Sequence, residues 1–203
     1  MKLLLHVCCA PCSVQCIEAL ASENIQPDLF WYNPNIHPYT EYRSRRDTLR
    51  GFAEEKKLSL ILEDEYGLRS FIRGVSALEA GSPGESPGEK KENRCAFCYR
   101  LRLEKAARRA AEKNYDAFST TLLISPYQNH ELLRKTGEEL AARYGIAFFY
   151  RDFRPHFRLG QARAREAGYY MQKYCGCIYS EEERYLQKRE SKTSGGRASG
   201  GSP

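Results

Sequence analysis

Short apolar runs alternate with longer amphipathic segments along most of the chain. Residues 2–7 (KLLLHV) form an apolar run that is typical of a strand buried on both faces of a sheet. In residues 13–22, Val14, Ile17 and Leu20 recur at helical spacing, which predicts a helix with Ser13 as its N-cap. The same alternation predicts strands over 28–32, 58–62, 117–124 and 146–150, and helices over 40–57, 94–113 and 129–144.

This order of elements predicts the fold class. Strands that alternate with helices imply parallel βαβ units, so we expect an α/β fold with a parallel-sheet, Rossmann-like sandwich and a helical cysteine-bearing portion. The length of 203 residues fits one domain, which we place at 1–190. Glycine and proline are frequent in 76–93, which predicts a mobile loop, and apolar side chains are scarce in 191–203, which predicts a disordered tail.

Charge and hydropathy limit the partners and the cellular location that the protein can have. The chain has 32 Lys and Arg against 26 Asp and Glu, a net charge of +6, which permits a nucleic-acid partner. No apolar run approaches the ~18–20 residues that are needed to cross a bilayer. The start MKLLLHVCC is too short for a signal peptide. We therefore expect a cytoplasmic protein with no membrane partner.

The eight cysteines are grouped rather than scattered. Cytosolic proteins keep their thiols reduced, and close groups of thiols are typical of metal ligands or redox centres. Cys8, Cys9 and Cys12 directly follow the first predicted strand, where a parallel sheet binds its ligands. The start of a helix also favours the thiolate form. Packing as a small apolar residue is the alternative, which we favour for Cys16.

The second group, Cys95 and Cys98, is a CxxC motif at the start of a predicted helix. Such a pair serves zinc sites, iron–sulfur sites and dithiol redox sites. With Cys8 and Cys9 it completes a four-thiol set that suits zinc and an iron–sulfur cluster equally well. A closed zinc site needs only four ligands, so the thiols left over favour redox chemistry beside a metal.

The third group, Cys175 and Cys177, is a CxC motif. A disulfide between these two residues would close a small, strained ring that is easily reduced. The motif therefore favours a redox-active pair. Two ligands for a second metal are the alternative interpretation.

Basic and aromatic residues flank the cysteine motifs. Residues 94–113 carry seven basic side chains against two acidic ones, and residues 151–173 carry six against two with aromatic residues between them. Basic side chains bind phosphates and flat side chains stack on unpaired bases, although a solvated helix face explains either run alone.

The segment SPYQNH (125–130) follows a predicted strand and offers groups that donate protons. Tyr127 and His130 are candidates, together with His6 and Asp152. A purely structural role, in which the segment ends a strand and caps a helix, explains these residues equally well.

Several motifs in order resemble the QueH family of epoxyqueuosine reductases. They are HVCCAPC (6–12), RCAFCYRLRL (94–103), TTLLISPYQNHE (120–131), RDFRPHFR (151–158) and QKYCGCIYSE (172–181). The resemblance covers roughly residues 3–182. One departure is His156, where a small residue, usually glycine, is expected in that family.

The resemblance implies a function and a cofactor. It implies reduction of epoxyqueuosine in tRNA, at the wobble position, to queuosine, on a sheet similar to that of the PP-loop or HUP class, with an unidentified electron donor. It further implies that Cys8, Cys9, Cys95 and Cys98 bind a [4Fe–4S] cluster and that Cys12 lies at a second iron ion. Cys175 and Cys177 match the CxC motif of the family, for which we expect a redox role.

Two other functions compete with this one. A PP-loop enzyme that adenylates a tRNA base would need a glycine-rich phosphate loop after the first strand, where this chain has CCAPCS without glycine. A zinc-stabilised RNA-binding module explains the CxxC motif and the basic runs. It gives no role to the CxC motif or to the cysteines at the strand end.

Overall fold

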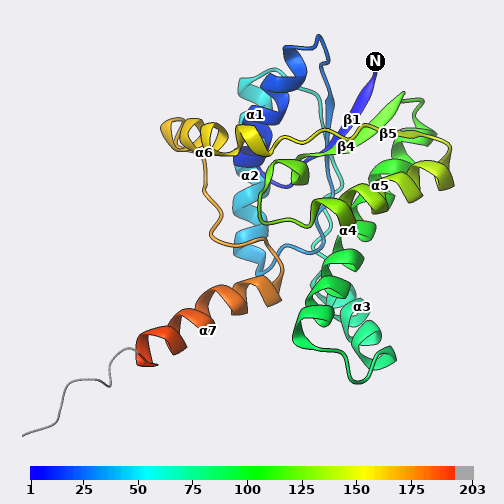
Figure 1. Cartoon of the computed structure of the whole chain (residues 1–203). Coiled ribbons are helices and arrows are strands. Elements are labelled where there is room, and N and C mark those ends of the chain that lie inside the picture. The colour runs from blue at the N-terminus through cyan, green and yellow to red at the C-terminus, as the bar shows by residue number, and fades with distance from the viewer. Residues whose placement is uncertain (195–203) are drawn as a thin grey trace, which may run out of the picture.

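The structure, a computed structural model, describes residues 1–194 and has a five-stranded parallel sheet between two layers of helices (Figure 1). The sheet order is β3-β2-β1-β4-β5. The strands are β1 (Leu3–His6), β2 (Asp28–Trp31), β3 (Leu60–Leu62), β4 (Ala117–Thr120) and β5 (Ala147–Phe148). The helices are α1 (Ala10–Ala21), α2 (Tyr39–Glu55), α3 (Leu68–Gly81), α4 (Pro87–Glu112), α5 (His130–Tyr144), α6 (Phe157–Glu166) and α7 (Ile178–Ser194), with short 3-10 turns η1 (Thr121–Ile124) and η2 (Arg154–His156). The predicted Rossmann-like α/β sandwich is confirmed.

The central strand is β1. Leu3, Leu4 and Leu5 have no exposed surface, as the apolar run in the sequence predicted. Leu5 pairs with Leu29 of β2 on one side and with Ser119 of β4 on the other. A parallel strand with neighbours on both edges and helices on both faces must be apolar throughout, which β1 is.

The order of the strands places the binding edge of the sheet. From β1 the chain builds outward through β2 and β3, then returns to the other side of β1 with β4 and β5. The direction of winding therefore reverses between β1 and β4. In open α/β sheets, ligands bind in the crevice beyond the carboxyl ends of the strands at such a switch point. The segments that leave β1 and β4 begin with Val7 and Thr121.

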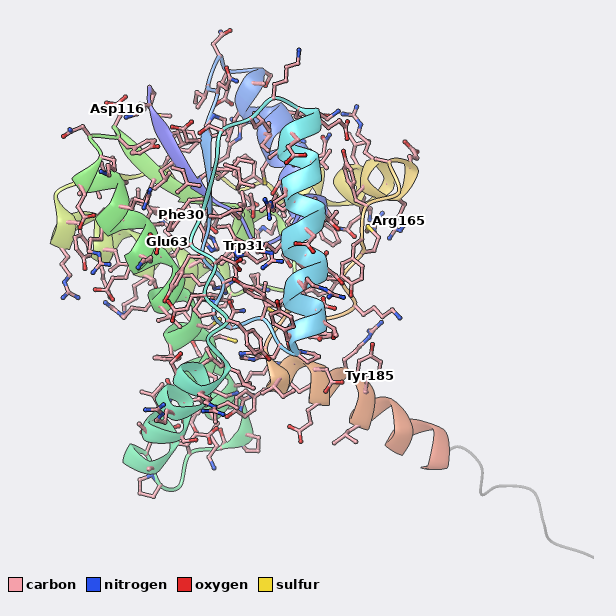
Figure 2. All side chains as sticks on the ribbon, turned by 180° about the vertical axis from the view of Figure 1, so that it is seen from behind. Phe30, Trp31, Glu63, Asp116, Arg165 and Tyr185 are labelled. Carbon is pink, nitrogen blue, oxygen red and sulfur yellow. The ribbon has the colours of Figure 1, made fainter. Side chains whose placement is uncertain are left out.

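Helices cover both faces of the sheet. α1, α2 and α6 lie on one face, and α4 and α5 lie on the other (Figure 1). Figure 2 shows Phe30 and Trp31 in the interior beside α2. The indole N–H of Trp31 donates to the hydroxyl of Tyr42 (3.3 Å), which in turn donates to the carboxylate of Asp64 (2.8 Å). These two hydrogen bonds attach α2 to the loop after β3.

The last helix, α7, extends away from the sheet (Figure 1). It runs to Ser194, so the first four residues of the segment predicted to be a disordered tail are helical, and residues 195–203 lie outside the described residues. Within residues 1–194, no helix combines the length and the apolar character that a bilayer span requires.

The predicted loop over 76–93 is wrong, because most of it is helical. α3 continues to Gly81 and α4 begins at Pro87. Ser86 and Glu89 form a capping box, and a proline is tolerated in the first turn of a helix because its missing N–H has no partner there. Packing between the two helices stabilises them further, since the ring of Phe71 in α3 lies 5.8 Å from that of Phe97 in α4.

Three predicted boundaries also differ from the structure. α1 begins at Ala10 with Cys9 in the N-cap position, and Ser13 lies one turn inside, where its hydroxyl donates to the Cys9 carbonyl (2.8 Å). β4 ends at Thr120 because its hydroxyl accepts from the N–H of Leu122 and starts the turn η1. β5 comprises two residues of the five predicted.

Close packing of α3 on α4 requires a glycine. A Cβ built on Gly74 would lie 2.3 Å from Cζ of Phe97, whereas a Cβ on Gly51 in α2 would meet nothing within 4 Å. We predict that Gly74→Ala lowers the free energy of unfolding by about 1–3 kcal/mol through overpacking. Gly51→Ala, the matched control, should raise it by about 0.5–1 kcal/mol. Urea titration of both variants measures this, and equal effects would contradict the packing.

Candidate metal centre and active site

Three thiols meet where β1 ends and α1 begins. The sulfurs of Cys8, Cys9 and Cys12 all lie within 4.8 Å of one another, and the three side chains are 7%, 1% and 6% exposed. Cys9 has extended backbone (φ −174°, ψ 163°), and the helix that starts immediately after it turns Cys12 back toward the strand end. The sequence predicted that Cys8, Cys9 and Cys12 serve one site at the end of the first strand, and the structure brings the three sulfurs together.

The pKa values of the three thiols are shifted in different directions. Hydrogen bonds from the thiols of Cys12 and Cys9 hold the pKa of Cys8 well below its ordinary value. Burial raises the pKa of Cys9, and the hydrogen bond to Cys8 raises that of Cys12. Of the three thiols, Cys8 therefore loses its proton most readily. Thiolates are the soft ligands that zinc, copper(I) and iron–sulfur centres select, so the donor set fits a metal of that kind.

Residues after β4 complete this edge of the sheet. The N–H of Cys8 donates to Oγ1 of Thr121 (3.3 Å), and that hydroxyl donates to the sulfur of Cys8 (3.7 Å). His6 is fully buried, with Nε2 donating to the carbonyl of Tyr32 (3.2 Å) and Nδ1 accepting from the hydroxyl of Thr120 (2.9 Å). Burial, followed by the charge of Arg102, lowers the pKa of His6 to about 4, so the ring is neutral at pH 7.

The CxxC motif lies inside α4 rather than at its start. The helix begins at Pro87, two turns before Cys95, so the predicted position of the motif at a helix start is wrong. Burial raises the pKa of Cys95 to about 11. Cys98 is buried, and its sulfur accepts from Nη2 of Arg102 (3.2 Å), one turn further along the helix. Cys98 packs with Phe71 and Cys177 in a small apolar cluster.

The CxC motif follows α6 on an irregular segment. Cys175 is exposed and Cys177 is partly buried, and all eight cysteines are free thiols, so no disulfide joins the two. Gly176 between them has φ +140°, a conformation that other residues rarely adopt. Its carbonyl accepts from the N–H of His37 (2.7 Å). Contacts between segments that are remote in the sequence therefore fix the backbone conformation of the CxC motif.

A buried arginine attaches the CxC segment to the fold. Arg45 of α2 is 1% exposed and pairs with Glu41 (2.7 Å). Its guanidinium donates to the carbonyls of Tyr174 and Cys175, each at 2.9 Å. Burial alone would lower the pKa of Arg45, but the neighbouring Cys9 and the Glu41 carboxylate raise it above its usual value. Arg45 is therefore a permanent cation beside the thiols.

A cavity of about 1080 Å³ opens over this edge of the sheet. It exposes thiols from two groups, because Cys8 and Cys12 line it together with Cys175. Amide side chains orient two of these sulfurs. Nε2 of Gln172 donates to Cys12 and Nε2 of Gln128 donates to Cys175, each at 3.4 Å. Sequence reasoning assigned no role to either contact, since an amide that faces a thiol has no local signature in the chain.

The other predicted site residues divide between the cavity and the interior. Tyr127 lines the cavity and is 84% exposed. His130 does not line it and is buried at the start of α5, where its Nε2 contacts the Ser125 carbonyl (3.1 Å). Cys9 and the CxxC thiols lie behind the cavity wall rather than on it.

The sheet order and the thiols at its switch point define a Rossmann-like protein with a candidate thiolate metal centre and an adjoining cavity. A family model described as "Epoxyqueuosine reductase QueH" matches residues 3–183. The chain belongs to the QueH family of epoxyqueuosine reductases, which are oxidoreductases.

Curated relatives agree with the family model. A protein named epoxyqueuosine reductase QueH from Dehalococcoides mccartyi is 35% identical over 184 residues, which cover 91% of this chain and 94% of the relative. Relatives with the same name from Acinetobacter baylyi and Thermotoga maritima are 36% and 33% identical. Those alignments cover 88% and 89% of this chain and 80% and 91% of the relatives.

A solved structure shares the fold. It is described as a predicted subunit of a tRNA methyltransferase from Methanocaldococcus jannaschii, and it matches with a TM-score of 0.50 at 15% identity over 93% of this chain and 88% of that one. At this identity the likeness concerns the fold alone.

The burial of Arg45 gives a testable consequence. Arg45→Met leaves the Glu41 carboxylate buried without its cation and should lower the free energy of unfolding by about 3–5 kcal/mol. Adding Glu41→Gln removes that charge and should restore much of the lost free energy of unfolding. In both variants the CxC segment loses its attachment to Arg45, so the amide of Gly176 should exchange faster. Urea titration and amide exchange measure the two effects. A loss below about 1 kcal/mol in the single variant would contradict the pairing.

Proposed function

We propose that this protein reduces the epoxide of epoxyqueuosine in tRNA to give queuosine. The observation that carries the proposal is the cavity whose wall bears Cys8, Cys12 and Cys175, in a chain of this family. We place the reaction in the cytoplasm, where thiols such as these are kept reduced.

The cavity has the size that one modified nucleoside needs. Its volume of about 1080 Å³ lies just above the roughly 300–1,000 Å³ that is usual for small-molecule sites. Enzymes that act on a base take it out of the stack and hold it in a pocket. The hypermodified base would enter this cavity with its epoxide directed toward the thiols.

The chemistry requires two electrons and two protons. Removing the epoxide oxygen breaks two C–O bonds, leaves a C=C double bond and releases water. Two thiols that form a disulfide release two electrons and two protons, which balances the reaction. Cys175, on the cavity wall, and Cys177 are the pair that we propose for this role. An external reductant, whose identity is open, must then return the disulfide to the dithiol.

Tyr127 is the best candidate to protonate the leaving oxygen among the four that the sequence offered. His6 has both ring nitrogens engaged and no exposed surface, and His130 lies off the cavity. Hydrogen bonds from Arg154 hold the pKa of Asp152 at about 2, so this carboxylate has no proton to give at pH 7. The hydroxyl-bearing side chain of Tyr127 remains, exposed on the cavity wall.

We propose that Cys8, Cys9, Cys95 and Cys98 hold a [4Fe–4S] cluster and that Cys12 is a ligand of a second iron ion. Two contacts support the proposal: the sulfurs of Cys8 and Cys9 lie in one group, and Nη2 of Arg102 donates to the sulfur of Cys98 (3.2 Å). When bound, such centres supply electrons singly and a Lewis acid for the epoxide oxygen. Arg45 and Arg102 would balance the negative charge of the thiolate ligands.

The rival function, a zinc-stabilised RNA-binding module, leaves the thiols on the cavity wall without a role. A visible spectrum and one assay separate the two. Anaerobically reconstituted protein should be brown, with a broad band near roughly 400 nm, and should convert epoxyqueuosine in tRNA to queuosine when a chemical reductant is supplied. Colourless protein that retains zinc and leaves the modified base unchanged would overturn the proposal.

The ligand assignment is tested by substitution. Cys9→Ser and Cys95→Ser should each remove the colour and lower turnover beyond the roughly 10–100-fold that loss of an outer-shell partner costs. The matched control is Cys16→Ala, because Cys16 is fully buried in α1 and belongs to no predicted ligand set. Iron content and turnover of the three variants are compared. Full iron content in either serine variant would remove that cysteine from the set.

A further inference from the structure

The basic residues of 151–173 divide into two groups of three. Arg151, Arg154 and Arg163 form ion pairs with the acidic residues Glu23, Asp152 and Glu18. The other three basic residues form no ion pair with an acidic residue of the described side chains, and all three line the cavity and are exposed. These are Arg158, Arg165 and Lys173. Charges without a partner therefore gather at the cavity.

The periodicity of α6 explains this division. Arg158 and Arg165 are seven residues apart, so they lie on the same face of the helix, together with Gln161, which also lines the cavity. Arg163 points to another side and contacts α1 through Glu18. Figure 2 shows Arg165 on α6, on the same side of the molecule as Tyr185 of α7.

Lys173 extends the positive charge to the thiols. It lies between Gln172, whose amide contacts the sulfur of Cys12, and Tyr174, whose carbonyl is held by Arg45. The acidic residue on the cavity wall, Glu183, is already paired with Lys91 and Arg94. The cavity rim, formed by Arg158, Arg165 and Lys173, thus keeps a positive charge that the acidic residue of the wall does not balance.

An aromatic pair lies beside these cations. The ring of Tyr127 is 84% exposed and meets the ring of Phe157, the first residue of α6, edge to face at 5.9 Å between centroids. Both side chains line the cavity. An exposed ring that is held in place by a second ring offers a flat face for a nucleobase.

We propose that Arg158, Arg165 and Lys173 bind backbone phosphates of the RNA that flank the reacting nucleotide, and that Tyr127, supported by Phe157, stacks on a base at the cavity mouth. This inference rests on the proposed function and names the residues that would hold the substrate. Phosphate contacts position the nucleic acid, and stacking holds an unpaired base at little cost in sequence preference.

The phosphate contacts are tested by salt dependence. Binding of tRNA that carries epoxyqueuosine is measured without reductant, at several salt concentrations, for Arg158→Gln/Arg165→Gln/Lys173→Gln and for the control Arg151→Gln/Arg154→Gln/Arg163→Gln. Both triple variants lose three positive charges. The slope of log affinity against log salt should fall by about two in the first and stay within about 0.5 of wild type in the control. Equal slopes in the two triple variants would overturn the phosphate assignment.

The stacking role is tested at Tyr127. Tyr127→Leu should weaken tRNA binding by about tenfold, whereas Tyr127→Phe, which keeps the ring, should bind as wild type does. Equal binding of the leucine variant and wild type would refute stacking.

Reduction of epoxyqueuosine by the wild-type protein is measured in parallel, so that the two proposals fail separately. If the wild type reduces the base but the cavity triple variant keeps its salt slope, the inference about the rim is wrong while the function stands. If the slopes behave as expected and no base is reduced, the reductase proposal is wrong while the RNA-binding rim stands.

Discussion

Two fully buried arginines beside buried thiols are the feature on which the rest of the structure depends. A buried cation is costly unless it is paired and hydrogen-bonded, and Arg45 and Arg102 are each only 1% exposed. Arg45 connects α2 to the CxC segment through two carbonyls, and Arg102 contacts the sulfur and the carbonyl of Cys98. Thiols from three distant parts of the chain therefore lie near fixed positive charge, which opposes the rise in pKa that burial causes at Cys9 and Cys95.

This arrangement separates two roles for sulfur. Cys9, Cys95, Cys98 and Cys177 do not line the cavity, and Cys9 and Cys98 are buried. Cys8, Cys12 and Cys175 face the cavity, and two of them receive an amide N–H from a glutamine that orients the sulfur. In the account proposed here, Cys8, Cys9, Cys95 and Cys98 hold the cluster and Cys12 a further iron ion, while Cys175 on the cavity wall forms the redox pair with Cys177.

The fold could be predicted from the sequence because its signals are local. The leucine run of β1 and the helical spacing in α1 needed no knowledge of the rest of the chain. The segment around Gly74 and Pro87 was misjudged because two helices form there through their mutual packing, which composition does not reveal. The cysteine groups were evident as motifs, but the partnership of Arg45 with Cys175 joins residues 130 positions apart and has no local signature.

The central claim is that this edge of the sheet holds iron and sulfide on cysteine thiolates. Chemical analysis of iron and acid-labile sulfide in the anaerobically reconstituted full chain tests it most directly. The account predicts about five iron atoms and about four sulfides per chain, which correspond to one cubane cluster and one further ion. Iron without sulfide, or zinc in its place, would contradict the account.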